Sequence, residues 1–161
     1  KLLFMGGEFG QSGEWNFEQS LDWHLLDHRY HQGIKNTVAS LNKLYKKQPA
    51  LYEKQFSADG FEWINYSDTE NSVISYIRKG DDPSENLVIV CNMTPVIRED
   101  YRIGTPFGGK LKEVFNSDSE EFGGSGVANK KLQAQEIPWN GRPHSVGLTL
   151  PPLGCVVLSA K

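Results

Sequence analysis

The sequence predicts a mainly β protein, in which an antiparallel β-sandwich over residues 49–161 follows a single strand–loop–helix unit over residues 1–48. After Pro49 the chain consists of short β-rich runs, separated by turn clusters roughly every ten residues. Val146, Leu148 and Leu150 alternate with small or polar residues, as in a strand with one face on a core and the other in water. Before Pro49 the sequence shows only one short apolar run and one helical pattern.

The first unit begins with the apolar run 1–5, which Gly6 and Gly7 stop and which is typical of a strand covered on both faces. A helix is expected farther on, because apolar residues share one of its faces: Ile34, Val38, Leu41, Leu44 and Tyr45. Two lysines close its last turn before Pro49. A lone βα unit leaves its strand without neighbours, so we expect residues 1–48 to be a fragment of a larger domain.

The second unit carries the strands of the predicted sandwich. They are expected at residues 61–66, 72–78, 86–93, 101–104, 111–116, 145–150 and 155–159. The stretch 119–135 is rich in Gly, Ser and Asn and is expected to be a long surface loop. Cys91 and Cys155 lie in apolar runs, where each is most simply a buried, reduced thiol. A bridge between them, as in immunoglobulin domains, is the alternative.

Composition and charge exclude several classes of function. The 161 residues are 38% hydrophobic, and their 17 basic and 20 acidic side chains are spread along the chain, with a net charge of −3. No basic stripe is available to neutralise phosphates, so we expect no nucleic-acid partner. No window approaches the roughly 18 consecutive apolar residues that cross a bilayer, so we expect no membrane insertion.

Glu8 is the first candidate site residue, because it follows the predicted strand 1–5 directly and lies between glycines. The glycines allow a ligand to approach the backbone closely, and a carboxylate at this place is able to hydrogen-bond sugar hydroxyls or to brace catalytic groups. The alternative is a structural role, in which Glu8 bonds to backbone amides of its own loop.

Trp15 and Trp23 make the first loop unusually aromatic, together with Phe9 and Phe17. Flat apolar rings with a polar edge stack on the faces of pyranose sugars, so both tryptophans are candidates for carbohydrate binding. The alternative is burial between the loop and the helix. We favour burial for Trp23, which precedes two leucines, and leave both possibilities open for Trp15.

His24, His28 and His31 have the spacing of one helical face, which raises a zinc site as an alternative. The sequence has no His-Glu-x-x-His arrangement, so surface or capping histidines are the preferred interpretation and no metal is expected. Phosphate-binding glycine loops, nucleophile elbows and Cys-x-x-Cys pairs are also missing. Asp118 lies in a turn-forming stretch, with a polar ligand contact as its alternative role.

Several ordered motifs resemble the bacterial-type glucan (glycogen) branching enzymes of the alpha-amylase superfamily. They occupy residues 1–11, 14–16, 21–26, 41–45, 49–53, 60–64, 92–96, 116–119 and 148–153. The first reads Lys-Leu-Leu-Phe-Met-Gly-Gly-Glu-Phe-Gly-Gln, and the last reads Leu-Thr-Leu-Pro-Pro-Leu. The resemblance covers essentially the whole chain.

This resemblance implies that residues 1–5 are the last strand of a (β/α)8 barrel, that the segment to about Lys47 is its last loop and helix, and that the rest is the C-terminal β-sandwich domain. It also implies a retaining transfer, in which an α-1,4 glucan is cleaved through a covalent intermediate on an Asp, with a Glu as acid/base, and passed to a 6-hydroxyl. These carboxylates lie on earlier barrel strands. The resemblance therefore implies no catalytic residue in this chain, which we expect to be inactive alone.

The expected partners are an α-glucan and the missing N-terminal barrel, with no cofactor and a cytoplasmic location. Two alternatives belong to other classes of protein. One is a non-catalytic carbohydrate-binding or structural β-sandwich module that depends on Trp63 or Trp139. The other is a small metal-dependent hydrolase built on the three histidines.

Overall fold

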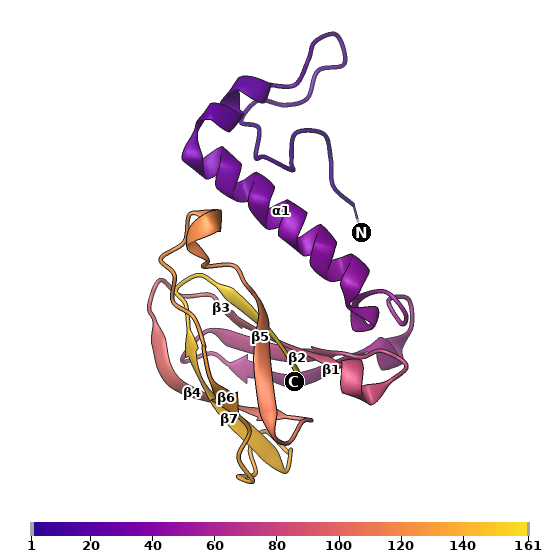
Figure 1. Ribbon diagram of the computed structural model, residues 1–161, viewed down its shortest axis with the longest axis vertical. Helices are drawn as coiled ribbons and strands as arrows, with labels where there is room; N and C mark the ends of the chain where they lie inside the picture. Colours follow the sequence, from indigo (N-terminus) through magenta and orange to yellow (C-terminus); the bar gives the residue numbers. More distant parts are fainter. Residues whose placement is uncertain (1, 161) are drawn as a thin grey trace.

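The computed structural model describes residues 2–160 as one α-helix and eight strands, with short 3-10 helices between them (Figure 1). The α-helix is α1 (Arg29–Lys47). The strands are β1 (Phe61–Asp68), β2 (Val73–Arg78), β3 (Leu87–Asn92), β4 (Arg98–Thr105), β5 (Lys110–Asn116), β6 (Leu132–Gln133), β7 (His144–Leu150) and β8 (Cys155–Ala160). The 3-10 helices are η1 (Trp23–Asp27), η2 (Pro49–Leu51), η3 (Ala58–Gly60), η4 (Pro83–Glu85) and η5 (Glu120–Phe122).

Within residues 2–160, no helix combines the length and the apolar character needed to cross a bilayer.

Two antiparallel sheets form the predicted sandwich. The larger has the strand order β1-β2-β3-β8-β5-β6, and the smaller pairs β4 with β7. Buried side chains from the facing sides of both sheets form the main core, including Ile77, Val90 and Leu158 from the larger sheet and Ile103 and Leu148 from the smaller one. Val146, Leu148 and Leu150, which alternate with small or polar residues in the sequence, are buried in this core. The predicted sandwich is therefore confirmed.

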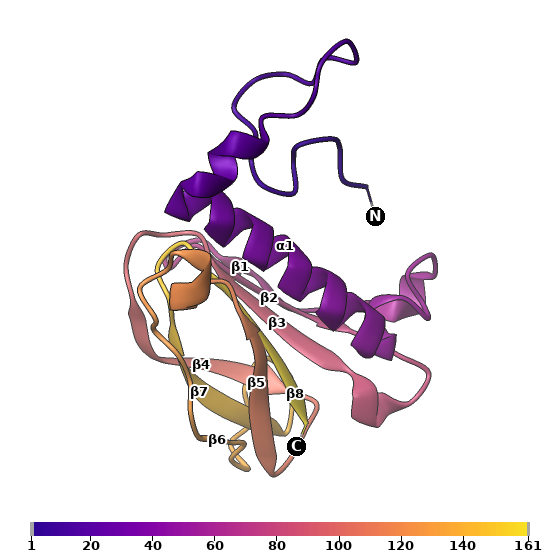
Figure 2. The ribbon, with the colours of Figure 1, turned by 45° about the horizontal axis from the view of Figure 1, so that its top comes forward.

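The outer face of the larger sheet carries a second apolar cluster, and α1 lies across it (Figure 2). Leu87 and Ile89 of β3 point to this face, whereas Val88 and Val90 point to the main core. Strand β3 is covered on both sides, which explains its uninterrupted apolar run. Leu44 of α1 is one of the residues that pack against the outer cluster.

Helix α1 ends where the sequence predicts and begins at Arg29, five residues before Ile34, which is the first apolar residue of its predicted face. The N–H of Gln48 donates to the carbonyl of Leu44, and the chain then turns at Pro49. Gly33 is buried, and a Cβ at this position would lie 2.4 Å from the carbonyl oxygen of Phe122. The glycine therefore allows η5 to approach the helix closely.

Two predicted features differ from the structure. Residues 2–5 form no strand, and Leu2, Leu3, Phe4 and Met5 are exposed. No strand of the described chain lies beside them to complete the backbone hydrogen bonds that a β-strand requires, and a turn bond from Gly7 N–H to the Phe4 carbonyl forms instead.

The stretch 119–135 is also more ordered than the expected surface loop. It contains η5 and the short strand β6, which pairs with β5 through Leu132. Leu132 and Ala134 are buried in the main core. The two residues of β6 are too few to show a strand pattern within a Gly- and Ser-rich segment.

Candidate functional site

Glu8 lies in a tight turn that precedes α1. Gln11 N–H donates to the carbonyl of Gly6 at 2.9 Å, and Gly6 has a positive φ of 84° that favours glycine. Glu8 is half-buried, and its carboxylate makes no hydrogen bond or ion pair within residues 2–160. The alternative structural role requires bonds from this carboxylate to backbone amides, and the described residues provide none.

Trp15 lies in the loop before η1, Trp23 is the first residue of η1, and both are partly open to solvent. Trp15 is 36% exposed and packs edge-on against Phe4, with ring centroids 5.6 Å apart. Trp23 is 51% exposed, so the burial favoured for it is wrong in this chain. Phe9 takes the buried position instead and is covered in part by Trp23, with centroids 5.1 Å apart. Both indoles keep surface on which a sugar ring is able to stack.

The three histidines do not share a helical face. His24 lies in η1, His28 precedes α1 with an extended backbone, and only His31 is inside the helix. His31 Nδ1 is 2.8 Å from the carbonyl oxygen of Phe9, to which it donates. Across residues 2–160, no group of three or more His, Cys, Asp or Glu side chains is arranged to hold a metal ion. The spacing of the three histidines in the sequence therefore does not place them on one helical face, and it no longer supports a zinc site.

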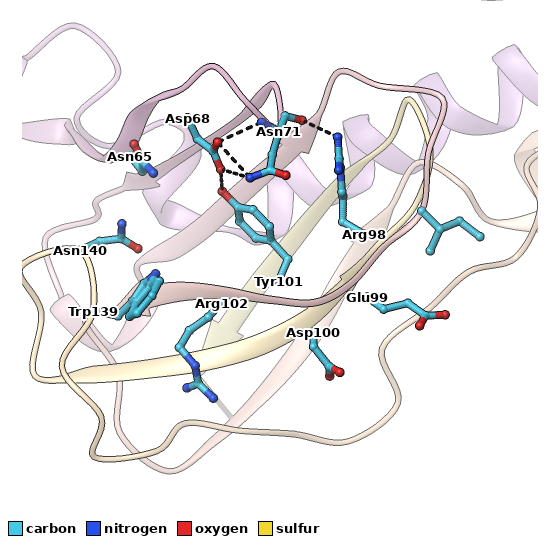
Figure 3. Close-up of a pocket in the computed structure, with 11 residues that line it drawn as sticks. Asn65, Asp68, Asn71, Arg98, Glu99, Asp100, Tyr101, Arg102, Trp139 and Asn140 are labelled. Atoms are coloured by element: carbon cyan, nitrogen blue, oxygen red, sulfur yellow. Dashed lines mark hydrogen bonds between the residues drawn. The ribbon is translucent and has the colours of Figure 1, made fainter.

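A groove of about 620 Å³ lies beside β4, between the turn that follows β1 and the turn that follows residue 138 (Figure 3). Its volume falls in the range of about 300–1,000 Å³ that is common for small-molecule sites. We call it the Trp139 groove; it is lined mainly by polar side chains, among them Asn65, Asp68, Arg98, Tyr101 and Asn140, with the indole of Trp139 at one end.

Asp68 is the centre of the hydrogen bonds in this groove. Its carboxylate accepts from the Tyr101 hydroxyl at 2.6 Å and from the backbone and side-chain nitrogens of Asn71 at 3.0–3.1 Å. Burial alone would raise the pKa of Asp68, but these hydrogen bonds outweigh it and hold the pKa below its usual value. Burial and the same hydrogen bond raise the pKa of Tyr101 far above the usual value. The pair is therefore a neutral phenol on a carboxylate.

The turn that carries Trp139 is fixed to the strands on both sides. Gly104 of β4 lets it approach, since a Cβ there would lie 2.2 Å from the Trp139 carbonyl oxygen. Asn140 has a positive φ of 49°, and its Oδ1 accepts from the Gly104 N–H at 2.9 Å. Arg142 closes the turn and forms an ion pair with Glu62 of β1. Hydrogen bonding from Lys79, together with Arg142, holds the pKa of Glu62 below its usual value.

A second group of aromatic side chains lies on β1 and β2. Phe61, Trp63, Tyr66 and Tyr76 contact one another, with ring centroids 4.8–5.9 Å apart. Tyr76 packs against the outer cluster of the larger sheet, and Trp63 is 46% exposed. Of the two tryptophans considered for a carbohydrate-binding module, Trp139 therefore lies in a groove, whereas Trp63 lies on an aromatic sheet face.

Sequence reasoning missed the Asp68–Tyr101 pair and the groove around it. The two residues are 33 positions apart, and no local motif connects them. Asp118 was singled out, but it is buried and its carboxylate accepts from Ser125 and from the Val127 N–H. This is the turn role predicted for it. The two cysteines are free, as expected, but they are only partly buried, and they lie directly opposite each other on β3 and β8.

Comparison with known proteins agrees with the β-sandwich. Residues 63–161 match the family described as alpha amylase, C-terminal all-beta domain, and the chain belongs to that family. Across nearly all of its length it is also similar to 1,4-alpha-glucan branching enzymes named GlgB. It is 55% identical to the one from Cereibacter sphaeroides and 52% identical to the one from Aquifex aeolicus, covering 99% and 98% of this chain. The resemblance found in the sequence motifs is confirmed.

The chain spans only 22% and 25% of the length of these two relatives. Among solved structures, a MutB mutant from crystals soaked with trehalulose matches with a TM-score of 0.54 over 87% of this chain and 20% of its own, at 15% identity. Isomaltulose synthase (PalI) from Klebsiella sp. LX3 matches with a TM-score of 0.50 over 80% of this chain and 18% of its own, at 20% identity. At such low identity these likenesses support the fold alone.

Proposed function

We propose that the chain is the C-terminal part of a 1,4-α-glucan branching enzyme that acts in glycogen synthesis in the cytoplasm. In this proposal residues 1–48 complete the catalytic barrel with its last strand, loop and helix, and residues 49–161 are the β-domain that packs beside it. The similarity to the branching enzymes supports this proposal, because it extends over residues 1–62, which the match to the β-domain family leaves out.

The observation that carries the proposal is the large number of exposed apolar side chains in the first unit. These are Leu2, Leu3, Phe4, Met5, Phe17, Trp23, Tyr30, Ile34 and Leu41, each more than 40% exposed. Helix α1 uses Leu44 to pack on the sheet, while Ile34 and Leu41, from the same predicted apolar face, stay open to solvent. An apolar surface of this kind marks an interface, and the neighbouring parts of a barrel would cover it.

The chemistry would come mainly from the rest of the enzyme. The glycosidic bond breaks as an aspartate forms a covalent bond to the sugar, and a 6-hydroxyl then displaces that aspartate to form the branch. Neither this aspartate nor its acid/base partner is expected in the present chain, which we therefore expect to be inactive alone and to need no cofactor. Glu8, Trp15 and Trp23 would contact the α-glucan, because they follow the last strand at the active-site end of a barrel.

A chimera tests this proposal. The matching C-terminal residues of the Aquifex aeolicus relative would be replaced by residues 1–161, and the formation of α-1,6 linkages would be measured on amylose. We expect the chimera to branch amylose, because the two sequences are 52% identical over this region. A chimera that folds cooperatively and makes no branch would contradict the proposal.

The same chimera tests the three candidate residues. Glu8→Gln keeps the size of the side chain and removes its charge, and we expect activity to fall by about tenfold or more, equivalent to roughly 1.4 kcal/mol of transition-state stabilisation. Trp15→Ala and Trp23→Ala should raise KM more than they lower kcat if the indoles only hold substrate. Glu18→Gln, an exposed change in the same loop, is the matched control.

A further inference from the structure

We propose that the Trp139 groove binds an α-glucan chain at a place separate from residues 1–48. The presence of a saccharide site is argued from the groove itself, and the choice of an α-linked glucan rests on the proposed function. None of the residues that line the groove comes from residues 1–60. The site would therefore hold polymer without taking part in the chemistry.

The first step is the combination of one flat ring with open hydrogen-bonding groups. Trp139 is 47% exposed and offers an indole face at the end of the groove (Figure 3). Beside it, Asn140 uses Oδ1 to accept from Gly104, and its Nδ2 makes no hydrogen bond within residues 2–160. Asn65 accepts from Ser67 through Oδ1, and its Nδ2 has no hydrogen-bond partner in the part of the chain that the structure describes. Two amide donors next to an aromatic face match a pyranose, which has an apolar ring face and hydroxyl acceptors at its edge.

The second step is rigidity. Tyr101 forms one wall of the groove, and its hydroxyl is held by Asp68 at 2.6 Å. Arg102 is held by Ser145 and Gln135, both at 2.9 Å. Ordering these groups costs little when a ligand arrives, because the fold has already fixed them.

The third step is charge, which decides the class of ligand. Asp68, Glu99 and Asp100 place three carboxylates on the groove. Arg98 and Arg102 supply two guanidinium groups, and both donate hydrogen bonds to neighbouring protein atoms. This balance disfavours phosphates and nucleotides, which need an excess of free cations. An uncharged, hydroxyl-rich ligand fits it better.

The fourth step is location. Helix α1 lies on the outer face of the larger sheet, whereas the groove lies along β4 of the smaller sheet and at the β1 edge. A barrel that covered the first unit would thus leave the groove open. A second site on the same polymer raises the effective concentration of its chains near the enzyme, so weak binding here would be sufficient.

The experiment measures the retardation of residues 1–161 in native gels that contain increasing amounts of glycogen. We expect retardation from which a Kd is read, competition by maltoheptaose, and no competition by cellohexaose at the same concentration. Trp139→Ala should weaken binding roughly tenfold, equivalent to about 1.4 kcal/mol. Trp63→Ala is the matched comparison, since the two indoles are 47% and 46% exposed, and it should bind like the parent chain.

A second variant guards against misfolding of the first. Asn140→Asp keeps the oxygen that accepts from Gly104 and removes the two N–H donors, so it should preserve the thermal midpoint and weaken binding roughly threefold. The proposal fails if the parent chain is not retarded, if Trp139→Ala binds as tightly as the parent, or if Trp63→Ala alone loses binding. It also fails if cellohexaose competes equally.

These outcomes are separate from the test of the proposed function. An active chimera together with an unretarded chain would remove the groove as a glucan site and leave the branching function in place. An inactive chimera together with binding that depends on Trp139 would leave the saccharide site in place and remove the branching function.

Discussion

The carboxylate of Asp68 and the phenol of Tyr101 connect the two sheets of the sandwich. Asp68 ends β1 of the larger sheet, and Tyr101 lies in β4 of the smaller one. A hydrogen bond to a charged acceptor contributes more than one between neutral groups, and it also keeps the carboxylate ionised. This contact therefore holds one wall of the Trp139 groove and links the two sheets.

We expect Tyr101→Phe to lower the free energy of unfolding by about 1–2 kcal/mol at neutral pH, measured by urea denaturation. Since the pKa of Asp68 is lowered on folding, its contribution is present above its unfolded pKa and is lost as the pH falls through the folded one. The difference in the free energy of unfolding between the parent chain and Tyr101→Phe should thus shrink below about pH 4. Tyr66→Phe is the control, because its hydroxyl makes no hydrogen bond in residues 2–160. Equal stability of parent and Tyr101→Phe at pH 7 would contradict this account.

Cys91 and Cys155 face each other on β3 and β8 with unequal acidities. A hydrogen bond from Cys155 lowers the pKa of Cys91, and the same interaction together with burial raises the pKa of Cys155. We expect iodoacetamide to modify Cys91 before Cys155 as the pH rises from about 7 to 9. Mass spectrometry of the modified peptides would measure both rates. Cys155→Ala should slow that reaction by removing the donor. Faster modification of Cys155 would show that access, rather than acidity, controls these thiols.

At the scale of elements, α1 depends on a residue that disfavours helices. In an open helix, Gly→Ala stabilises by about 1 kcal/mol. At Gly33 the added methyl would meet the backbone of Phe122, which has no side-chain freedom to move away. We expect Gly33→Ala to destabilise the chain by about 1–3 kcal/mol in chemical denaturation.

Gly147→Ala is the matched control for that substitution. Gly147 lies in β7, and a Cβ there would meet nothing within 4 Å. This variant should leave the unfolding midpoint nearly unchanged. A stabilised Gly33→Ala would mean that η5 does not rest against the helix in solution.

Alternation and turn chemistry predict most of the strands within a few residues. The C-terminal end of α1 follows from its lysines and Pro49. The first residue of α1 could not be predicted in the same way, because Arg29 and Tyr30 give no apolar pattern and His28 provides no side-chain cap. The groove could not be predicted either, since its walls come from segments that only the pairing of distant strands brings together. Glu8, Trp15 and Trp23 could be singled out locally because they follow one another within one short stretch of sequence before α1.

At the scale of the whole molecule, the two units differ in how completely they are covered. The sandwich has a closed core, whereas many large apolar side chains of the first unit are exposed to solvent. We expect residues 1–161 to self-associate with rising concentration, measured by sedimentation velocity. The double substitution Ile34→Gln and Leu41→Gln should weaken that association without lowering the thermal midpoint, since both side chains are about 40% exposed. A strictly monomeric parent chain would count against an uncovered interface.

The position of β8 within the larger sheet has a consequence for biosynthesis. It comes last among the eight described strands, yet it pairs with β3 on one side and with β5 on the other. Until a ribosome has released residues 155–160, the nascent sheet is two separate ribbons with unprotected edges between them. Chaperones that recognise such edges should therefore stay bound to this region until translation has passed it.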